Sequence, residues 1–133
     1  MFLVDTSVWI DIFRDRTLAK RQAFEKLVDA NSIVLSRFTQ MELLQGCRDD
    51  GEWRLLQIYL AEQDYVEQTV ESWTEAARIY YDLRRRGLTV RSTIDCCIAQ
   101  IAIEYQLTLV HNDRDFETIQ QVRSLSCLRF QLS

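Results

Sequence analysis

The chain has 133 residues, of which 47% are hydrophobic. This length and composition suit one globular domain over residues 1–133 and exclude a disordered chain. No apolar run approaches the roughly 20 residues that a membrane helix needs, so we expect a cytoplasmic protein without a membrane partner. The net charge of −4 argues at first sight against nucleic acid as a partner, because phosphate groups are bound by Lys and Arg.

Short apolar runs predict the strands of a buried parallel sheet. The clearest runs are residues 2–4, 33–35 and 107–111, and weaker candidates lie at 65–67 and 128–132. Segments with helical periodicity lie between the strands. The predicted helices cover residues 7–14, 18–28, 39–48, 52–59, 72–86 and 92–105, and a short one follows Asp115. This alternation predicts an α/β fold, in which ligands bind at the carboxyl ends of the strands.

Five acidic residues stand where an apolar run ends or a helix begins: Asp5, Glu42, Asp95, Asp113 and Asp115. Carboxylates that converge within about 4 Å repel by roughly 4 kcal/mol per pair at an effective dielectric near 20. A bound cation is the simplest way to offset that repulsion. Oxygen ligands favour Mg2+ or Mn2+. Without these five acids the net charge of the chain changes from −4 to +1, which weakens the argument against a nucleic-acid partner.

Some of these acids also have a purely structural interpretation. Thr39 and Glu42 have the spacing of a helix capping box, and Ser92 and Asp95 resemble the same device. Asp113 suits a helix N-cap. Asp5 differs, because it follows a buried strand and no basic residue stands near it before Arg14.

Basic residues cluster near the end of the helix predicted over residues 72–86. Arg84, Arg85, Arg86 and Arg91 could contact an RNA backbone, or could be solvated residues that favour the helix dipole. Both interpretations stay open.

The histidine and the cysteines do not form a zinc pattern. His111 is the only histidine, and we expect it to pack at a strand end. The cysteines show no CxxC spacing, so we expect reduced and mostly buried thiols. They are Cys47, Cys96, Cys97 and Cys127.

Four motifs occur in a fixed order: VDTSVWID at 4–11, MELLQG at 41–46, DCCIA at 95–99 and NDRDFE at 112–117. Together they resemble PIN-domain ribonucleases, in particular the VapC toxins of bacterial toxin–antitoxin pairs. The resemblance implies a three-layer α/β/α sandwich around a parallel sheet of four to five strands. It further implies a Mg2+- or Mn2+-dependent endoribonuclease that forms a homodimer and is inhibited by a VapB-type antitoxin.

The resemblance also implies the roles of individual residues. Asp5, Glu42, Asp95 and Asp113 match the catalytic and metal-binding acids of the family, and Asp115 matches a further acidic ligand. Thr6 and Ser7 match polar residues that orient the first Asp or a bound water. The implied reaction is hydrolysis of an RNA phosphodiester by a metal-activated water.

Three other interpretations of an acidic α/β domain were compared with the chain, and two of them need residues that it lacks. A receiver-type phosphoacceptor needs a pair of acids after its first strand and a late Lys, whereas Asp5 stands alone and Lys26 is the last lysine. A haloacid-dehalogenase-like phosphatase needs an Asp where Ser7 stands. The alternative that survives is a catalytically silent PIN domain that serves as a protein- or RNA-binding module.

Overall fold

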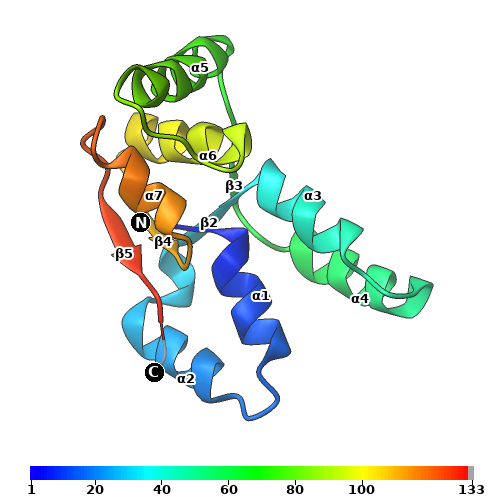
Figure 1. Ribbon diagram of the computed structural model, residues 1–133. Coiled ribbons are helices and arrows are strands. Elements are labelled where there is room, and N and C mark those ends of the chain that lie inside the picture. Colours follow the sequence, from blue (N-terminus) through cyan, green and yellow to red (C-terminus); the bar gives the residue numbers. More distant parts are fainter. Residues whose placement is uncertain (132–133) are drawn as a thin grey trace.

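Five parallel strands form the central sheet in the computed structural model, which describes residues 1–131 (Figure 1). Their order across the sheet is β3-β2-β1-β4-β5. The strands are β1 (Phe2–Val4), β2 (Ile33–Ser36), β3 (Tyr65–Val66), β4 (Thr108–His111) and β5 (Cys127–Arg129). Both weak strand predictions are confirmed, although Leu132, at the predicted end of the last strand, lies outside the described residues.

Helices follow the strands as predicted, with boundaries that differ by a few residues. They are α1 (Thr6–Arg14), α2 (Ala19–Leu27), α3 (Arg37–Gln45), α4 (Asp50–Ala61), α5 (Val70–Arg85), α6 (Thr93–Glu104) and α7 (Arg114–Ile119), with a 3-10 turn at Ala30–Ser32. Helix α7 begins before Asp115, so its predicted start was late by two residues. Across residues 1–131, every helix is too short or too polar to cross a membrane.

The alternation of side chains along each strand builds two cores. Leu3 and Leu109 point into the core beneath α5, α6 and α7, whereas Val4 and Val110 point into the core beneath α1, α2 and α4. All four side chains are at most 1% exposed, and burial of each contributes about 1.5–3 kcal/mol. The predicted three-layer α/β/α sandwich is therefore confirmed, and Figure 1 shows α5 and α6 on the opposite side of the sheet from α1 and α2.

Strand β1 lies between β2 and β4, and the chain reverses its direction of travel across the sheet at this point. Val4 lies beside Val110, and the next amide, that of Asp5, donates a hydrogen bond to the Val110 carbonyl at 2.9 Å. The turns after β1 and β4 thus emerge side by side at the carboxyl end of the sheet. In open parallel sheets this switch point is where ligands bind.

Two large apolar side chains lie at the surface although their helices pack on the core. Trp73 on α5 is 58% exposed and Met41 on α3 is 49% exposed. Helix α5 instead buries Ala76, Ile79 and Leu83 in the core it shares with α6. The face of α5 that carries Trp73 is therefore left at the surface.

Candidate metal centre

Asp5 directly follows β1 and caps the N-terminus of α1. Its Oδ2 accepts hydrogen bonds from the Ser7 amide at 3.1 Å and from the Ser7 hydroxyl at 2.6 Å. Burial raises the pKa of Asp5 to about 6, the hydrogen bonds from Ser7 oppose that rise, and Glu42 and Asp113 add to it. The Ser7 hydroxyl also accepts a bond from the Asn112 amide at 2.9 Å, so it ties the turn after β1 to the turn after β4.

Thr6 positions Glu42 from the neighbouring helix. The Thr6 hydroxyl lies 2.9 Å from Glu42 Oε1 and 3.1 Å from the Thr39 hydroxyl. Helix α3 begins at Arg37, and Ser36 is its N-cap, with its hydroxyl accepting a bond from the Thr39 amide at 3.2 Å. Glu42 therefore lies beyond the first turn, and the capping-box interpretation of Thr39 and Glu42 is wrong.

Asp95, Asp113 and Asp115 converge most closely. One carboxylate oxygen from each lies within 4.8 Å of the others. Asp113 is the N-cap of α7, as expected, and its carboxylate accepts a bond from the Asp115 amide at 2.9 Å. Burial and the negative charges of Asp5, Asp113, Asp115 and Glu42 raise the pKa of Asp95 to about 8. All five predicted acids thus lie close enough together for the other four to influence the pKa of Asp95.

Arg91 also lies at this site, in contact with two of the acids, and this contact was not predicted. Its Nη2 lies 2.8 Å from Asp113 Oδ1, and its Nε lies 3.0 Å from Asp115 Oδ2. By its position in the sequence, Arg91 was grouped with Arg84, Arg85 and Arg86 as a basic cluster. The spacing between Arg91 and the two aspartates, more than 20 residues, gave no local signal of the contact.

The donor set fits a hard divalent cation. Every converging ligand is a carboxylate oxygen, which favours Mg2+ or Mn2+ over zinc. The four cysteines are free, and Cys96 and Cys97 are buried, as expected. The raised pKa values of Asp5 and Asp95 report repulsion and burial that a bound cation relieves.

His111 packs at the end of β4, as predicted. It is fully buried, its ring contacts Phe116 at a centroid distance of 5.1 Å, and its Nδ1 accepts a bond from the Asp113 amide at 3.1 Å. Burial lowers the pKa of His111. A neutral imidazole therefore holds the backbone of Asp113 in place.

The predicted RNA-binding arginines make different contacts. Arg84 and Arg85 lie exposed at the end of α5, where the Arg85 guanidinium lies 5.7 Å from the centre of the Tyr81 ring. Arg86 donates to the Gln121 carbonyl at 2.8 Å. Arg91 instead faces the acidic site.

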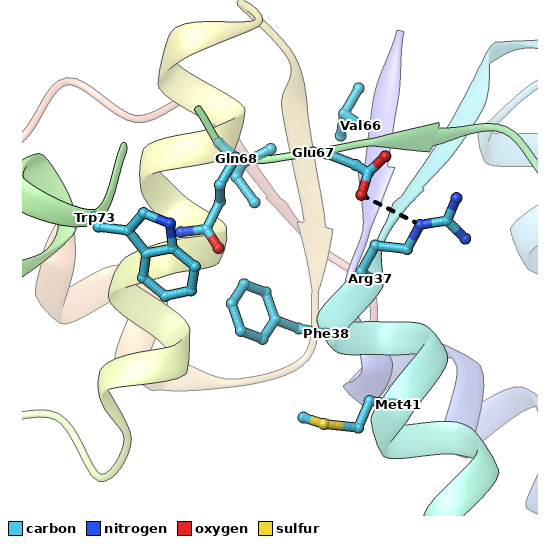
Figure 2. A pocket seen from close by; sticks show the side chains of 8 residues that line it. Arg37, Phe38, Met41, Val66, Glu67, Gln68 and Trp73 are labelled. Atoms are coloured by element: carbon cyan, nitrogen blue, oxygen red, sulfur yellow. Dashed lines mark ion pairs between the residues drawn. The ribbon is translucent and has the colours of Figure 1, made fainter. Parts of the chain in front are cut away.

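An apolar pocket of about 330 Å³ lies apart from the acids, between α3, β3 and the start of α5 (Figure 2). Figure 2 shows Phe38 and Trp73 facing each other in it, and their ring centres are 6.3 Å apart. Arg37 and Glu67 form an ion pair of 3.6 Å at its rim. Most of the residues that line the pocket are uncharged, so the pocket suits contact with an apolar group.

The PIN domain model matches residues 2–121 of the chain. The match covers both strands of the switch point and all five acids. The chain therefore belongs to the PIN-domain family.

Two curated relatives are more specific. Ribonuclease VapC11 of Mycobacterium tuberculosis and VapC ribonuclease Mb1587 of Mycobacterium bovis are each 33% identical over 135 residues, covering 98% of this chain and 100% of the relative. Among solved structures, VapBC2 from Rickettsia felis, bound to a DNA fragment from its promoter, has a TM-score of 0.78 at 19% identity over 98% of both chains. Within the PIN-domain family, the chain falls with the VapC ribonucleases.

Proposed function

We propose that the protein is the toxin of a VapBC-type pair and that it cleaves RNA internally with a divalent metal ion. The observation that carries the proposal is the convergence of Asp95, Asp113 and Asp115 beside Asp5 at the switch point of a PIN fold. The 33% identity to ribonucleases that span the whole chain supports the activity.

Asp95, Asp113 and Asp115 are the proposed principal ligands of Mg2+ or Mn2+, and Asp5 lies close enough to influence the pKa of Asp95. When bound, such an ion lowers the pKa of a water molecule and neutralises charge that develops on the phosphate. Ser7 holds Asp5 through both its amide and its hydroxyl, so the orientation of this carboxylate is fixed before substrate arrives.

Glu42 is the proposed acceptor of the proton that the attacking water loses. Its Oε1 is held by the Thr6 hydroxyl at 2.9 Å, which leaves Oε2 for the proton. Glu42 lies outside the closest group of three aspartates, so we assign the ligand role to those aspartates and the base role to Glu42.

RNA contacts are proposed for Arg84 and Arg85, whose exposed guanidinium groups lie at the end of α5. Arg86 and Arg91 belong to the same proposed set, although Arg86 already binds the Gln121 carbonyl. Guanidinium groups suit phosphate oxygens because their N–H donors are arranged in a planar fork.

A VapB-type antitoxin and a second copy of the chain are the proposed protein partners. Exposed apolar side chains on α1 and α4 that line one hollow, namely Phe13, Leu55 and Tyr59, provide a surface for the antitoxin. Phe13 also lines a groove of about 480 Å³ that holds Arg14, Arg16 and Arg48 together with Glu42 and Glu52. Arg48 already pairs with Glu52 at 2.9 Å, so Arg14 and Arg16 are the groups that suit an acidic segment. The solved complex of VapBC2 from Rickettsia felis supports a partner of this kind.

The test of the proposed activity is cleavage of total bacterial RNA by purified, antitoxin-free protein with Mg2+, with Mn2+ and with EDTA. Asp5→Asn is the test variant, and Asp64→Asn, at an exposed position outside the site, is the matched control. We expect discrete metal-dependent cuts from the wild type and the control but none from Asp5→Asn. Absence of cleavage under every condition would favour the silent binding module.

A further inference from the structure

Arg91 supplies the only basic side chain that forms an ion pair with any of the five acids within residues 1–131. It contacts Asp113 and Asp115 at once, at 2.8 and 3.0 Å. Its backbone amide also donates to Asp115 Oδ2 at 3.2 Å. The guanidinium therefore uses carboxylate oxygens of two residues that are proposed metal ligands.

The guanidinium can leave these carboxylates without unfolding the segment that carries it. Val90, the preceding residue, is only 5% exposed, and Ser92, the following residue, caps α6 by accepting a bond from the Ile94 amide at 3.1 Å. These two anchors fix the backbone on both sides. The Arg91 side chain itself is 73% exposed, so its movement displaces water rather than core residues.

We propose that Arg91 is a built-in counter-ion that competes with the divalent metal for Asp113 and Asp115. A guanidinium and a divalent cation beside the same oxygens repel each other, so the site holds one or the other at bonding distance. In the metal-free protein Arg91 offsets part of the carboxylate repulsion and lowers the affinity for metal. The inference rests on the proposed metal-dependent function of this site.

When a metal ion displaces the Arg91 guanidinium from the two carboxylates, this guanidinium becomes free to bind another group. Once Arg91 leaves the carboxylates, its guanidinium remains tethered beside the acids by Val90 and Ser92 and presents N–H donors that suit an RNA phosphate. A phosphate that holds the displaced guanidinium favours the metal-bound state, because anything that binds one of two competing states shifts the equilibrium toward it.

The test is isothermal titration calorimetry, in which Mn2+ is titrated into the metal-free full chain and its affinity is measured. Arg91→Gln removes the competing charge. Arg114→Gln is the matched control, because Arg114 stands between Asp113 and Asp115 in the sequence and carries the same charge. Its side chain forms no ion pair within residues 1–131. We expect Arg91→Gln to bind Mn2+ at least about fivefold more tightly than the wild type, as expected for coupled sites. Arg114→Gln should stay within about twofold.

An Arg91→Gln affinity that is unchanged or weaker would overturn the inference, and so would an equal gain in Arg114→Gln. Arg91→Lys, which reaches one carboxylate at a time, should bind with intermediate affinity and serves if the glutamine variant folds poorly. Asp95→Asn separates this inference from the proposed function. If Asp95→Asn binds Mn2+ like the wild type, the metal site itself is wrong; if it loses Mn2+ binding while Arg91→Gln binds like the wild type, only the role of Arg91 is wrong.

Discussion

Replacement of Asp95 by Asn should make the metal-free protein more stable at pH 8. The Asp95 carboxyl is partly buried beside four other acids, and these surroundings raise its pKa to about 8. Within residues 1–131 its side chain forms no ion pair, so the substitution removes repulsion without breaking a favourable charge contact. The neutral amide also nearly matches the carboxyl in shape.

The sign and size of the effect follow from proton linkage. As pH rises, the unfolded chain loses the Asp95 proton near its ordinary pKa of 3.8, whereas the folded chain keeps it until pH 8, so wild-type stability falls between these values. The full shift corresponds to about 6 kcal/mol above pH 8 at roughly 1.4 kcal/mol per unit. Because solvent screens this partly exposed group, we expect about half of that, or a rise in Tm of roughly 10 °C.

The assay is urea unfolding of both proteins in EDTA from pH 4 to pH 9. The stability difference should be near zero at pH 4 and should grow up to about pH 8. Asp82→Asn is a control of opposite sign, because Arg123 and Arg78 lower the pKa of Asp82, so its loss should destabilise the protein at neutral pH. An Asp95→Asn protein that is less stable than the wild type at pH 8 would refute the reasoning.

Three further outcomes are expected. Saturation of the wild type with Mn2+ at about 100 times its Kd should add roughly 2.7 kcal/mol of stability, measured as a rise in Tm, and Asp113→Asn should lose most of that rise. Thr6→Val removes the hydroxyl that holds Glu42 at 2.9 Å and should lower the RNA cleavage rate by about 10- to 100-fold with little change in Tm; an unchanged rate would count against the assigned role of Glu42. Ile79→Ala in the core under α5 should cost about 2–5 kcal/mol in urea unfolding, and a cost below about 1 kcal/mol would show that this core is not closely packed.

Much of the fold could be predicted because its signals are local. The apolar runs at 2–4 and 33–35 are buried on both faces of the sheet, which leaves no polar alternation to mistake for another element. Strand β3 has only two residues, Tyr65 and Val66, so periodicity could hardly define it. The exposure of Trp73 could not be predicted, because the sequence shows that α5 has an apolar face but not which part of that face α6 covers.

The site shows the same division between local and distant signals. Asp5 and Asp113 were predictable, since each follows a buried strand. Glu42 was ambiguous because both Ser36 and Thr39 are good cap residues, and Ser36 is the one that caps α3. The ion pairs of Arg91 with Asp113 and Asp115 could not be predicted from the sequence, because they depend on how α6 returns the chain to β4.

The most direct test of the proposed metal centre is anomalous diffraction from crystals soaked in Mn2+. We expect one or more anomalous peaks within about 2.5 Å of carboxylate oxygens of Asp95 and of Asp113 or Asp115, with the Arg91 guanidinium withdrawn from them. A peak elsewhere, or no peak at saturating Mn2+ in a well-ordered site, would contradict the assignment of these acids as a metal centre.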